Sequence, residues 1–168
     1  MLCILAKIDE AARTELLRLQ EVTKKFGLEP APVHGHVTLA CYTGKNEEEF
    51  IRSCRIKTSG LRRFRILYEG IEVFAASSVI AAAPGREKKI EEVHGDISSD
   101  WSDDLNSWTR DKVWLPHTTL LQNPDADLER IAESMREIFR PFSATVTELE
   151  FSKVNENGYE IIDSIMLP

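Results

Sequence analysis

The sequence lacks long hydrophobic runs, low-complexity stretches and Gly/Ser-rich linkers. Its apolar run at the N-terminus covers only residues 1–6, whereas a membrane-spanning helix needs about 20 apolar residues, and no basic leader of a secretory signal accompanies it. We therefore expect a cytoplasmic protein without a membrane partner. The chain of 168 residues is long enough for one domain or two small coupled lobes.

Cysteine is scarce as well. The three cysteines, Cys3, Cys41 and Cys54, are an odd number, and no two of them form a C-x-x-C pair or a regular framework. This spacing indicates neither a disulfide framework nor a cysteine metal knuckle. We therefore expect no disulfide bond and interpret all three cysteines as small core residues.

Positive charge is in deficit, because 21 Lys and Arg residues face 28 Asp and Glu residues and the formal net charge is -7. Affinity for long nucleic acids comes mostly from Lys and Arg side chains that neutralise phosphates. The charge balance therefore argues against binding of extended nucleic acids. A nucleotide or a short RNA end is still allowed as a ligand.

The hydrophobic pattern predicts strands that alternate with amphipathic helices. Strands are expected at residues 1–8, 36–41, 63–74, 77–83, 117–121, 142–154 and 159–167, and helices at 10–26, 46–55 and 86–101. A fourth helix is expected after Asn123 and Pro124, which suit the N-cap and the first helical position. Asn157-Gly158, the strongest short hairpin signal, separates the last two strands.

The order of elements repeats along the chain. An offset of 81 residues places His117 on His36 and also superposes the second helix on the fourth. Each copy then consists of a strand, a helix, a His-bearing strand, a helix and a strand, and an internal duplication explains this order. We therefore predict that residues 1–168 form a single bilobal domain of two interleaved α/β repeats, related by an approximate two-fold axis.

Two of the four histidines, His36 and His117, open the same tetrad, HVTL in one case and HTTL in the other. Coincidence explains this match poorly in a chain of ordinary composition. Alternate side chains of a strand point to the same face, so His36 should project together with Thr38, and His117 together with Thr119. A two-fold axis would make the two pairs face each other across a cleft.

Such a cleft is equipped to cleave or to form a phosphodiester. One neutral imidazole takes a proton from water or from a ribose hydroxyl, and the other, protonated, donates a proton to the leaving oxygen. The hydroxyl groups of Thr38 and Thr119 donate hydrogen bonds to non-bridging phosphate oxygens and stabilise the charge of the transition state. In the reverse direction the same four groups join two ends.

The tandem HVTL and HTTL motifs, in a duplicated α/β chain of this length, resemble those of the two-histidine phosphoesterases, particularly the bacterial 2′-5′ RNA ligase-like branch. The resemblance implies a bilobal α+β fold in which two antiparallel sheets surround a central cleft. It implies that His36 and His117 are catalytic and that Thr38 and Thr119 bind phosphate. It further implies hydrolysis or ligation of RNA ends, 2′,3′-cyclic phosphates or 2′-5′ linkages, and no metal cofactor.

Two other interpretations of the tetrads explain the residues less well. Strand histidines that are merely hydrogen-bonded in a core would have no reason to share the Thr and the Leu. A zinc site would need a third ligand at a regular spacing, and none accompanies His36 and His117, so no metal and no cofactor are predicted. The alternative function is a module that binds a nucleotide or an RNA end in the same cleft without turnover.

Several residues near the tetrads are secondary candidates. Tyr42 and Trp114 bracket the motifs and are candidate substrate contacts, because an exposed aromatic ring stacks on a nucleobase. Lys7 would help to hold a phosphate, although a solvated surface charge is the commoner outcome. We interpret His34 as a loop or rim residue, and His94 as the half-buried partner of a neighbouring carboxylate.

Overall fold

The computed structural model describes residues 1–30, 34–44, 46–85, 87–110, 114–155 and 158–168. Within them lie seven strands: β1 (Leu2–Ile8), β2 (His36–Tyr42), β3 (Phe64–Phe74), β4 (Val79–Pro84), β5 (Thr118–Gln122), β6 (Phe142–Asn155) and β7 (Gly158–Met166). The α-helices of the described part are α1 (Glu10–Lys24), α2 (Glu47–Lys57), α3 (Lys88–Ser98) and α4 (Leu128–Ile138). None of these four helices has the length and the apolar surface that a bilayer crossing requires.

Of the described α-helices, α1, α2 and α4 begin at residues whose side chains cap them, with one correction to the predicted caps. The side chains of Asp9 and Asn46 accept hydrogen bonds from backbone N–H groups in the first turns of α1 and α2, as this residue type does at an N-cap. α4 is capped by Asp127, and not by Asn123, whose side chain closes a local turn instead. Both residues are good caps, and the apolar stripe that starts at Leu128 decides between them.

Two predicted features involve residues outside the described ones. β6 and β7 form the predicted hairpin, but its predicted turn residue, Asn157, lies outside the described residues. Arg86, where the third helix was expected to start, lies outside them too. α3 itself is shorter than the expected span, because the chain continues after Ser98 as a 3₁₀ helix over residues 99–104.

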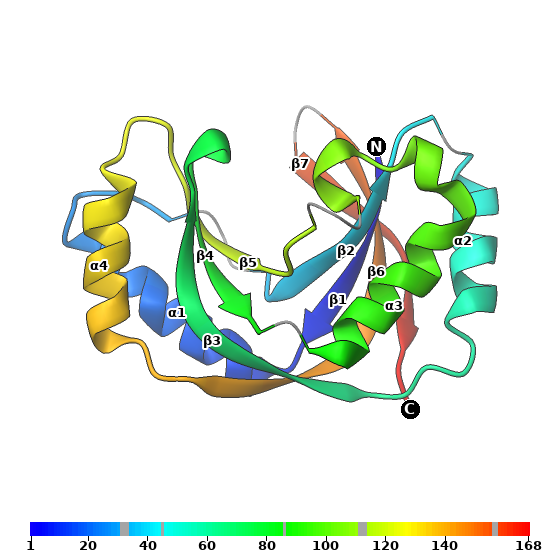
Figure 1. Cartoon of the computed structure of the whole chain (residues 1–168), viewed down its shortest axis with the longest axis horizontal. Helices are drawn as coiled ribbons and strands as arrows, with labels where there is room; N and C mark the ends of the chain where they lie inside the picture. The colour runs from blue at the N-terminus through cyan, green and yellow to red at the C-terminus, as the bar shows by residue number, and fades with distance from the viewer. Residues whose placement is uncertain (31–33, 45, 86, 111–113, 156–157) are drawn as a thin grey trace.

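All strand pairs in the described part of the chain are antiparallel and belong to one sheet with the order β2-β1-β6-β3-β4-β5, in which β7 pairs with β6. The α+β fold with antiparallel pairing is therefore confirmed. The two expected sheets are joined, because β6 is long enough to pair with β3 at its start and with β1 further along. Figure 1 shows the curved sheet with the helices on its outer side.

The strand order of the sheet is symmetric with respect to the two predicted repeats. Counted inward from either edge, strands with corresponding positions in the repeats follow one another in the same order. From one edge it runs β2, β1, β6 and from the other β5, β4, β3, so each half begins with a tetrad-bearing strand and ends with the third strand of the other repeat. The helices interleave as well, since α1 packs against α4 and α3 packs against β2. This order supports our proposal that residues 1–168 form one bilobal domain of two repeats.

The two faces of the sheet have different packing. Most buried apolar side chains, among them those of Ile4, Leu39 and Ile80, form one core between the sheet and the helices. The opposite face, which we call the inner face, carries a small cluster of Cys3, Leu5 and Cys41, against which Val154 and Tyr159 pack. The inner face is therefore free of helices where the tetrads lie, as Figure 1 shows for β2 and β5.

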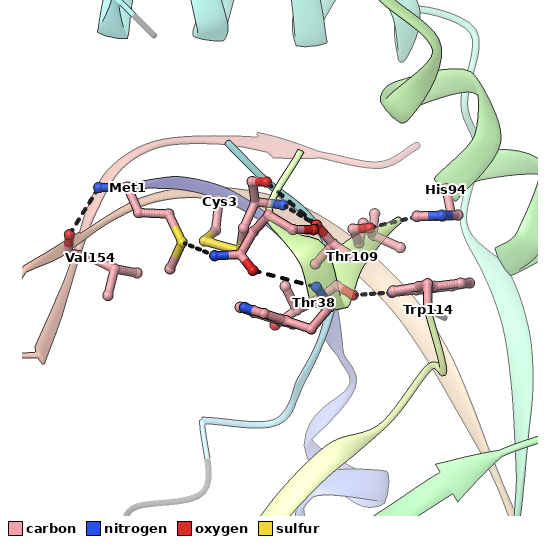
Figure 2. The surroundings of a disulfide bond; sticks show 11 residues. Met1, Cys3, Thr38, His94, Thr109, Trp114 and Val154 are labelled. Atoms are coloured by element: carbon pink, nitrogen blue, oxygen red, sulfur yellow. Dashed lines mark hydrogen bonds between the residues drawn. A yellow bond between two sulfur atoms is a disulfide. The ribbon is translucent and has the colours of Figure 1, made fainter. Parts of the chain in front are cut away.

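Cys3 and Cys41 form a disulfide bond, so the expectation of none was wrong. The two residues lie directly opposite each other on β1 and β2, and Figure 2 shows the bond among its neighbours. Their separation of 38 residues carries no signal of this pairing, which depends on the register of the two strands. All three cysteines are buried, as predicted, and Cys54 lies outside the disulfide.

Candidate active site

The two tetrads lie at the two edges of the sheet, one at the start of β2 and the other at the start of β5. In each tetrad the histidine and the following threonine at the third position are half-buried. Val37, Leu39 and Leu120 are fully buried in the core. The period of two along a strand thus sends the histidine and the third-position threonine of each tetrad to the inner face.

Each tetrad contains a bulge at its leucine. In the register of β1 with β2, Leu39 is an extra residue between two paired positions. In the register of β4 with β5, Leu120 is an extra residue in the same way. An extra residue reverses the face to which the following side chains point. Cys41 consequently reaches the inner face, and Tyr42 points into the core.

Tyr42 and Trp114, the two candidate substrate contacts, are both buried, which corrects that prediction. Tyr42 is 0% exposed, and its hydroxyl donates a hydrogen bond of 2.7 Å to a backbone oxygen of α3. Trp114 is 6% exposed and stacks on His94, with ring centroids 4.0 Å apart. Neither ring offers a face to a nucleobase. Without the bulge at Leu39, Tyr42 would have shared the face of His36.

Side chains that lie beside or within the second tetrad donate hydrogen bonds to the outer edge of β2. Thr118 Oγ1 donates a hydrogen bond of 2.8 Å to the backbone oxygen of His36. Trp114 Nε1 donates one of 2.9 Å to the backbone oxygen of Thr38, as Figure 2 shows. The hydroxyls of Tyr68 and Thr118 are 2.6 Å apart, and Tyr68 is the donor because Thr118 gives its only proton to His36. The two tetrads are thereby fixed relative to each other.

The carbonyl groups of the two bulge leucines are bound in equivalent ways. His94 Nδ1, on α3, donates to the backbone oxygen of Leu39 over 2.7 Å, and Gln20 Nε2, on α1, donates to that of Leu120 over 2.6 Å. His94 therefore has a carbonyl partner and not the expected carboxylate. In both halves a helix of one predicted repeat supports the tetrad of the other.

His36 lies in a largely desolvated environment. Its Nδ1 is buried without a hydrogen-bond partner among the described residues. Burial, with smaller contributions from the charges of His34 and His117, lowers the pKa of His36 to about 4. The influence of His117 means that the two tetrad histidines lie within electrostatic reach of each other. At neutral pH, His36 is therefore a neutral imidazole with a free lone pair.

His117 has a different environment. Its Nδ1 donates a hydrogen bond of 2.8 Å to the backbone oxygen of Leu115, which leaves Nε2 as the ring nitrogen available for proton exchange. Burial lowers the pKa of His117, but the hydrogen bond to the carbonyl opposes this shift because it favours the charged ring. The ring of Phe74 lies beside it, with centroids 4.9 Å apart.

Lys7 is the nearest cation to the first tetrad along the strands, because it pairs directly with His36 in the register of β1 and β2. Its ammonium lies 2.8 Å from a carboxylate oxygen of Glu150 and 3.2 Å from one of Glu148. The hydrogen bond to Glu150 is the main cause that raises the pKa of Lys7. Sequence reasoning did not identify Glu148 and Glu150 of β6 as neighbours of the site, although their spacing of two residues indicates that they share a face of the strand.

Two pockets flank the tetrad histidines. The polar pocket, of about 340 Å³, lies beside His36 and is lined mainly by Lys7, Glu10, Arg13, His34, Glu150 and Tyr159. The apolar pocket, of about 350 Å³, lies beside His117 and is lined by Glu72, Phe74, Ala83, Pro84, Leu115 and Pro116. In the part of the chain that the structure describes, no three His, Cys, Asp or Glu side chains come together in a way that would hold a metal ion.

An antiparallel α+β fold with HxTL tetrads on its two edge strands defines a two-histidine phosphoesterase fold. The chain belongs to the 2′-5′ RNA ligase superfamily, whose family model matches residues 8–158. No curated protein sequence matches the chain.

Solved structures with low sequence identity share the fold over nearly the whole chain. TT0787 of Thermus thermophilus has a TM-score of 0.73 at 19% identity, over 99% of this chain and 97% of that one. LigT of E. coli complexed with 3′-AMP has a TM-score of 0.66 at 15% identity, over 99% and 96%. Usb1 of Kluyveromyces marxianus has a TM-score of 0.51 at 16% identity, over 99% and 97%.

Proposed function

We propose that the protein is a metal-independent phosphoesterase that acts on a nucleotide or on an RNA-terminal phosphodiester. The substrates are a 2′,3′-cyclic phosphate or a 2′-5′ linkage, and the reaction is hydrolysis or its reversal, ligation. The observation that carries the proposal is the pair of HxTL tetrads on facing edge strands, joined by the hydrogen bond from Thr118 to the backbone oxygen of His36. Structures of E. coli LigT complexed with ATP, 3′-AMP and NADP+ support a nucleotide ligand.

His36 is the general base and His117 the general acid of the hydrolytic direction. His36 is neutral at pH 7 because burial lowers its pKa to about 4, so it can accept a proton from the attacking water. Burial lowers the pKa of His117, but the carbonyl of Leu115 opposes this shift by favouring the charged ring, and its Nε2 donates a proton to the leaving oxygen. The water oxygen forms the new bond to phosphorus as the bond to the leaving oxygen breaks.

Thr38 and Thr119 bind the non-bridging oxygens of the phosphate. Both are half-buried on the inner face, on the same strands as the histidines. A hydroxyl donor aimed at a phosphate oxygen stabilises the charge that develops in the transition state. Thr118 and Trp114, which hold the backbone of β2, position these groups without touching the substrate.

The test is turnover in the presence of a metal chelator. The purified protein is incubated with nucleoside 2′,3′-cyclic phosphates and 2′-5′ dinucleotides, beside His36→Ala, His117→Ala and the surface control Thr14→Val, an exposed residue of α1. We expect turnover by the wild type and the control. Each histidine variant should lose about 10² to 10⁴-fold while its circular dichroism spectrum is retained. Wild-type rates in either variant would refute the mechanism, and binding without turnover would favour a nucleotide-binding module.

A further inference from the structure

The two pockets beside the tetrad histidines differ in chemistry. In the polar pocket, charged groups of both signs meet at Lys7, Arg13 and Glu150. The described lining of the apolar pocket has one charged group, the carboxylate of Glu72, among apolar side chains. A substrate whose phosphate lies between the histidines would therefore meet two unlike surfaces.

The lining of the apolar pocket has the chemistry of a site for an aromatic group. Phe74 provides a half-buried ring, Leu115 is 43% exposed, and Pro116 continues the apolar wall. Small side chains lie on the inner face of β3 and β4, where Gly70 pairs with Ala83. A pocket of mostly apolar walls with one polar group is the usual form of a small-ligand site.

Glu72 supplies the polar group of this pocket. Its side chain is exposed, and it makes no hydrogen bond or ion pair with the other described residues. Its Oε1 lies over Gly70, 3.9 Å from the position that a Cβ atom there would occupy. A carboxylate only accepts hydrogen bonds, so it selects groups that donate.

We propose that the apolar pocket binds the nucleobase of the substrate and prefers a base with an exocyclic amino group. The inference rests on the proposed function, because it assumes a nucleotide whose phosphate lies between His36 and His117. Guanine, adenine and cytosine each present an amino group that donates to Glu72, and guanine adds a second donor beside it. Uracil presents a single N–H between two carbonyl oxygens, which the carboxylate repels.

The polar pocket is the less suitable place for the base. The rings of Tyr159 and His34 already pack against each other nearly at right angles, at an interplanar angle of 80°, and Lys7 is bound to Glu148 and Glu150. Stacking a base there would desolvate these charges, which is costly. Hydroxyl groups and further phosphates of the substrate suit this pocket better.

The experiment measures binding by calorimetry, so it does not depend on turnover. The probes are 3′-AMP, 3′-GMP, 3′-CMP and 3′-UMP. With the wild type we expect the three amino-bearing nucleotides to bind about 10-fold more tightly than 3′-UMP, the range of one charge-assisted hydrogen bond. Equal affinities for all four nucleotides would overturn the proposal.

Variants separate hydrogen bonding from stacking. Glu72→Ala should reduce the preference to less than about 3-fold, and Glu72→Gln should shift it toward 3′-UMP, because an amide also donates to a carbonyl. Phe74→Leu should weaken the binding of all four nucleotides by about 5-fold or more without changing the order of their affinities, since stacking is tolerant of base identity. Glu133→Ala, the same change on an exposed residue of α4, is the matched control.

The outcomes for the pocket and for the phosphoesterase are distinguishable. If the nucleotides bind in the expected order but none of the four 2′,3′-cyclic phosphates is hydrolysed, the base pocket stands and the proposed reaction fails. If they are hydrolysed at equal rates and bound with equal affinity, the reaction stands and the pocket assignment fails. Retention of the wild-type order by a folded Glu72→Ala protein would also overturn the assignment.

Discussion

The half of the sheet formed by β1, β2 and β6 and the half formed by β4, β5 and β3 have the same strand arrangement but different side chains on the inner face. Lys7 pairs with Glu148 in the first half, whereas Ala83 pairs with Gly70 at the corresponding place in the second. The backbone is thus nearly symmetric while the chemistry is not. An acid and a base need such a difference, because two histidines in identical surroundings would have the same pKa.

The first half is also more heavily braced. It alone carries the disulfide of Cys3 with Cys41 and the additional strand β7 among the described residues. β7 supplies Tyr159, whose ring approaches His36 at 5.9 Å, whereas the aromatic neighbour of His117 is Phe74, from β3. The aromatic neighbours of the two histidines therefore come from strands that do not correspond to each other in the two repeats.

The largest expected effect tests whether the two histidines have different roles. His36→Ala should lose about 10² to 10⁴-fold in kcat on every substrate, because no other group takes the proton of the water. His117→Ala should lose as much on a 2′,3′-cyclic phosphate but only about 10-fold on a nucleoside p-nitrophenyl phosphodiester, whose leaving group needs no acid. The measurement is the ratio of the kcat of each variant to that of the wild type, on both substrates. Equal losses on the activated ester would mean that the roles are not divided in this way.

The disulfide should stabilise the first half of the sheet. It closes a loop of 38 residues, and a native disulfide contributes typically about 2 to 4 kcal/mol, depending on the loop and the reference state. We expect Cys3→Ala and Cys41→Ala, singly or together, to lower the free energy of unfolding by this amount in urea titrations. Cys54→Ala, a change at the buried cysteine outside the disulfide, is the control for the loss of a buried sulfur. An equal effect of all three would contradict a role of the bond itself.

The sequence sufficed to predict the element order, the helix caps at Asp9 and Asn46 and the face shared by His36 and Thr38, because these depend on local chemistry or on the period of a strand. The disulfide and the burial of Tyr42 could not be predicted, and both have one cause. The bulge at Leu39 exchanges the faces of the residues after it, and no turn residue or charge marks the bulge in the sequence.

The surroundings of the site were also beyond sequence reasoning. Trp114 is buried because its indole N–H donates to the backbone oxygen of Thr38, a contact between segments 76 residues apart in the chain. The ion pairs of Lys7 with Glu148 and Glu150 depend in the same way on the register of β1 with β6. Side-chain types identified the tetrads, but only the sheet register identifies what surrounds them.

The acid stability of the protein should report the burial of His36. The folded state binds the proton of this residue with a pKa of about 4, below the ordinary value of about 6.5 for the unfolded chain. Unfolding therefore takes up a proton between these values, and the free energy of unfolding should fall by up to roughly 3 kcal/mol as the pH is lowered through this window. His36→Gln should remove more of this fall than His117→Gln, as measured by urea titrations from pH 7 to pH 4.

The rates should show the same asymmetry. The pKa values of both His36 and His117 are lowered. His36, the proposed base, should therefore stay unprotonated down to a lower pH than an ordinary histidine. His117, the proposed acid, should lose its proton at a lower pH than usual. The profile of kcat/KM against pH should be bell-shaped with its maximum on the acidic side of about 6.5. A maximum well above that pH would show that the surroundings in the free enzyme do not set these pKa values.

The smallest expected effect concerns the hydroxyl bridge between the halves. Thr118→Val, which copies the residue Val37 of the first tetrad, leaves the carbonyl of His36 and the hydroxyl of Tyr68 without their partner. A lost buried partner costs about 1 to 3 kcal/mol, so the free energy of unfolding should fall by this amount. If the bridge orients the proposed catalytic groups without touching the substrate, kcat should fall several-fold more than KM changes. Thr118→Ser should restore both quantities, and a Val variant with normal kcat would show that the bridge only stabilises the fold.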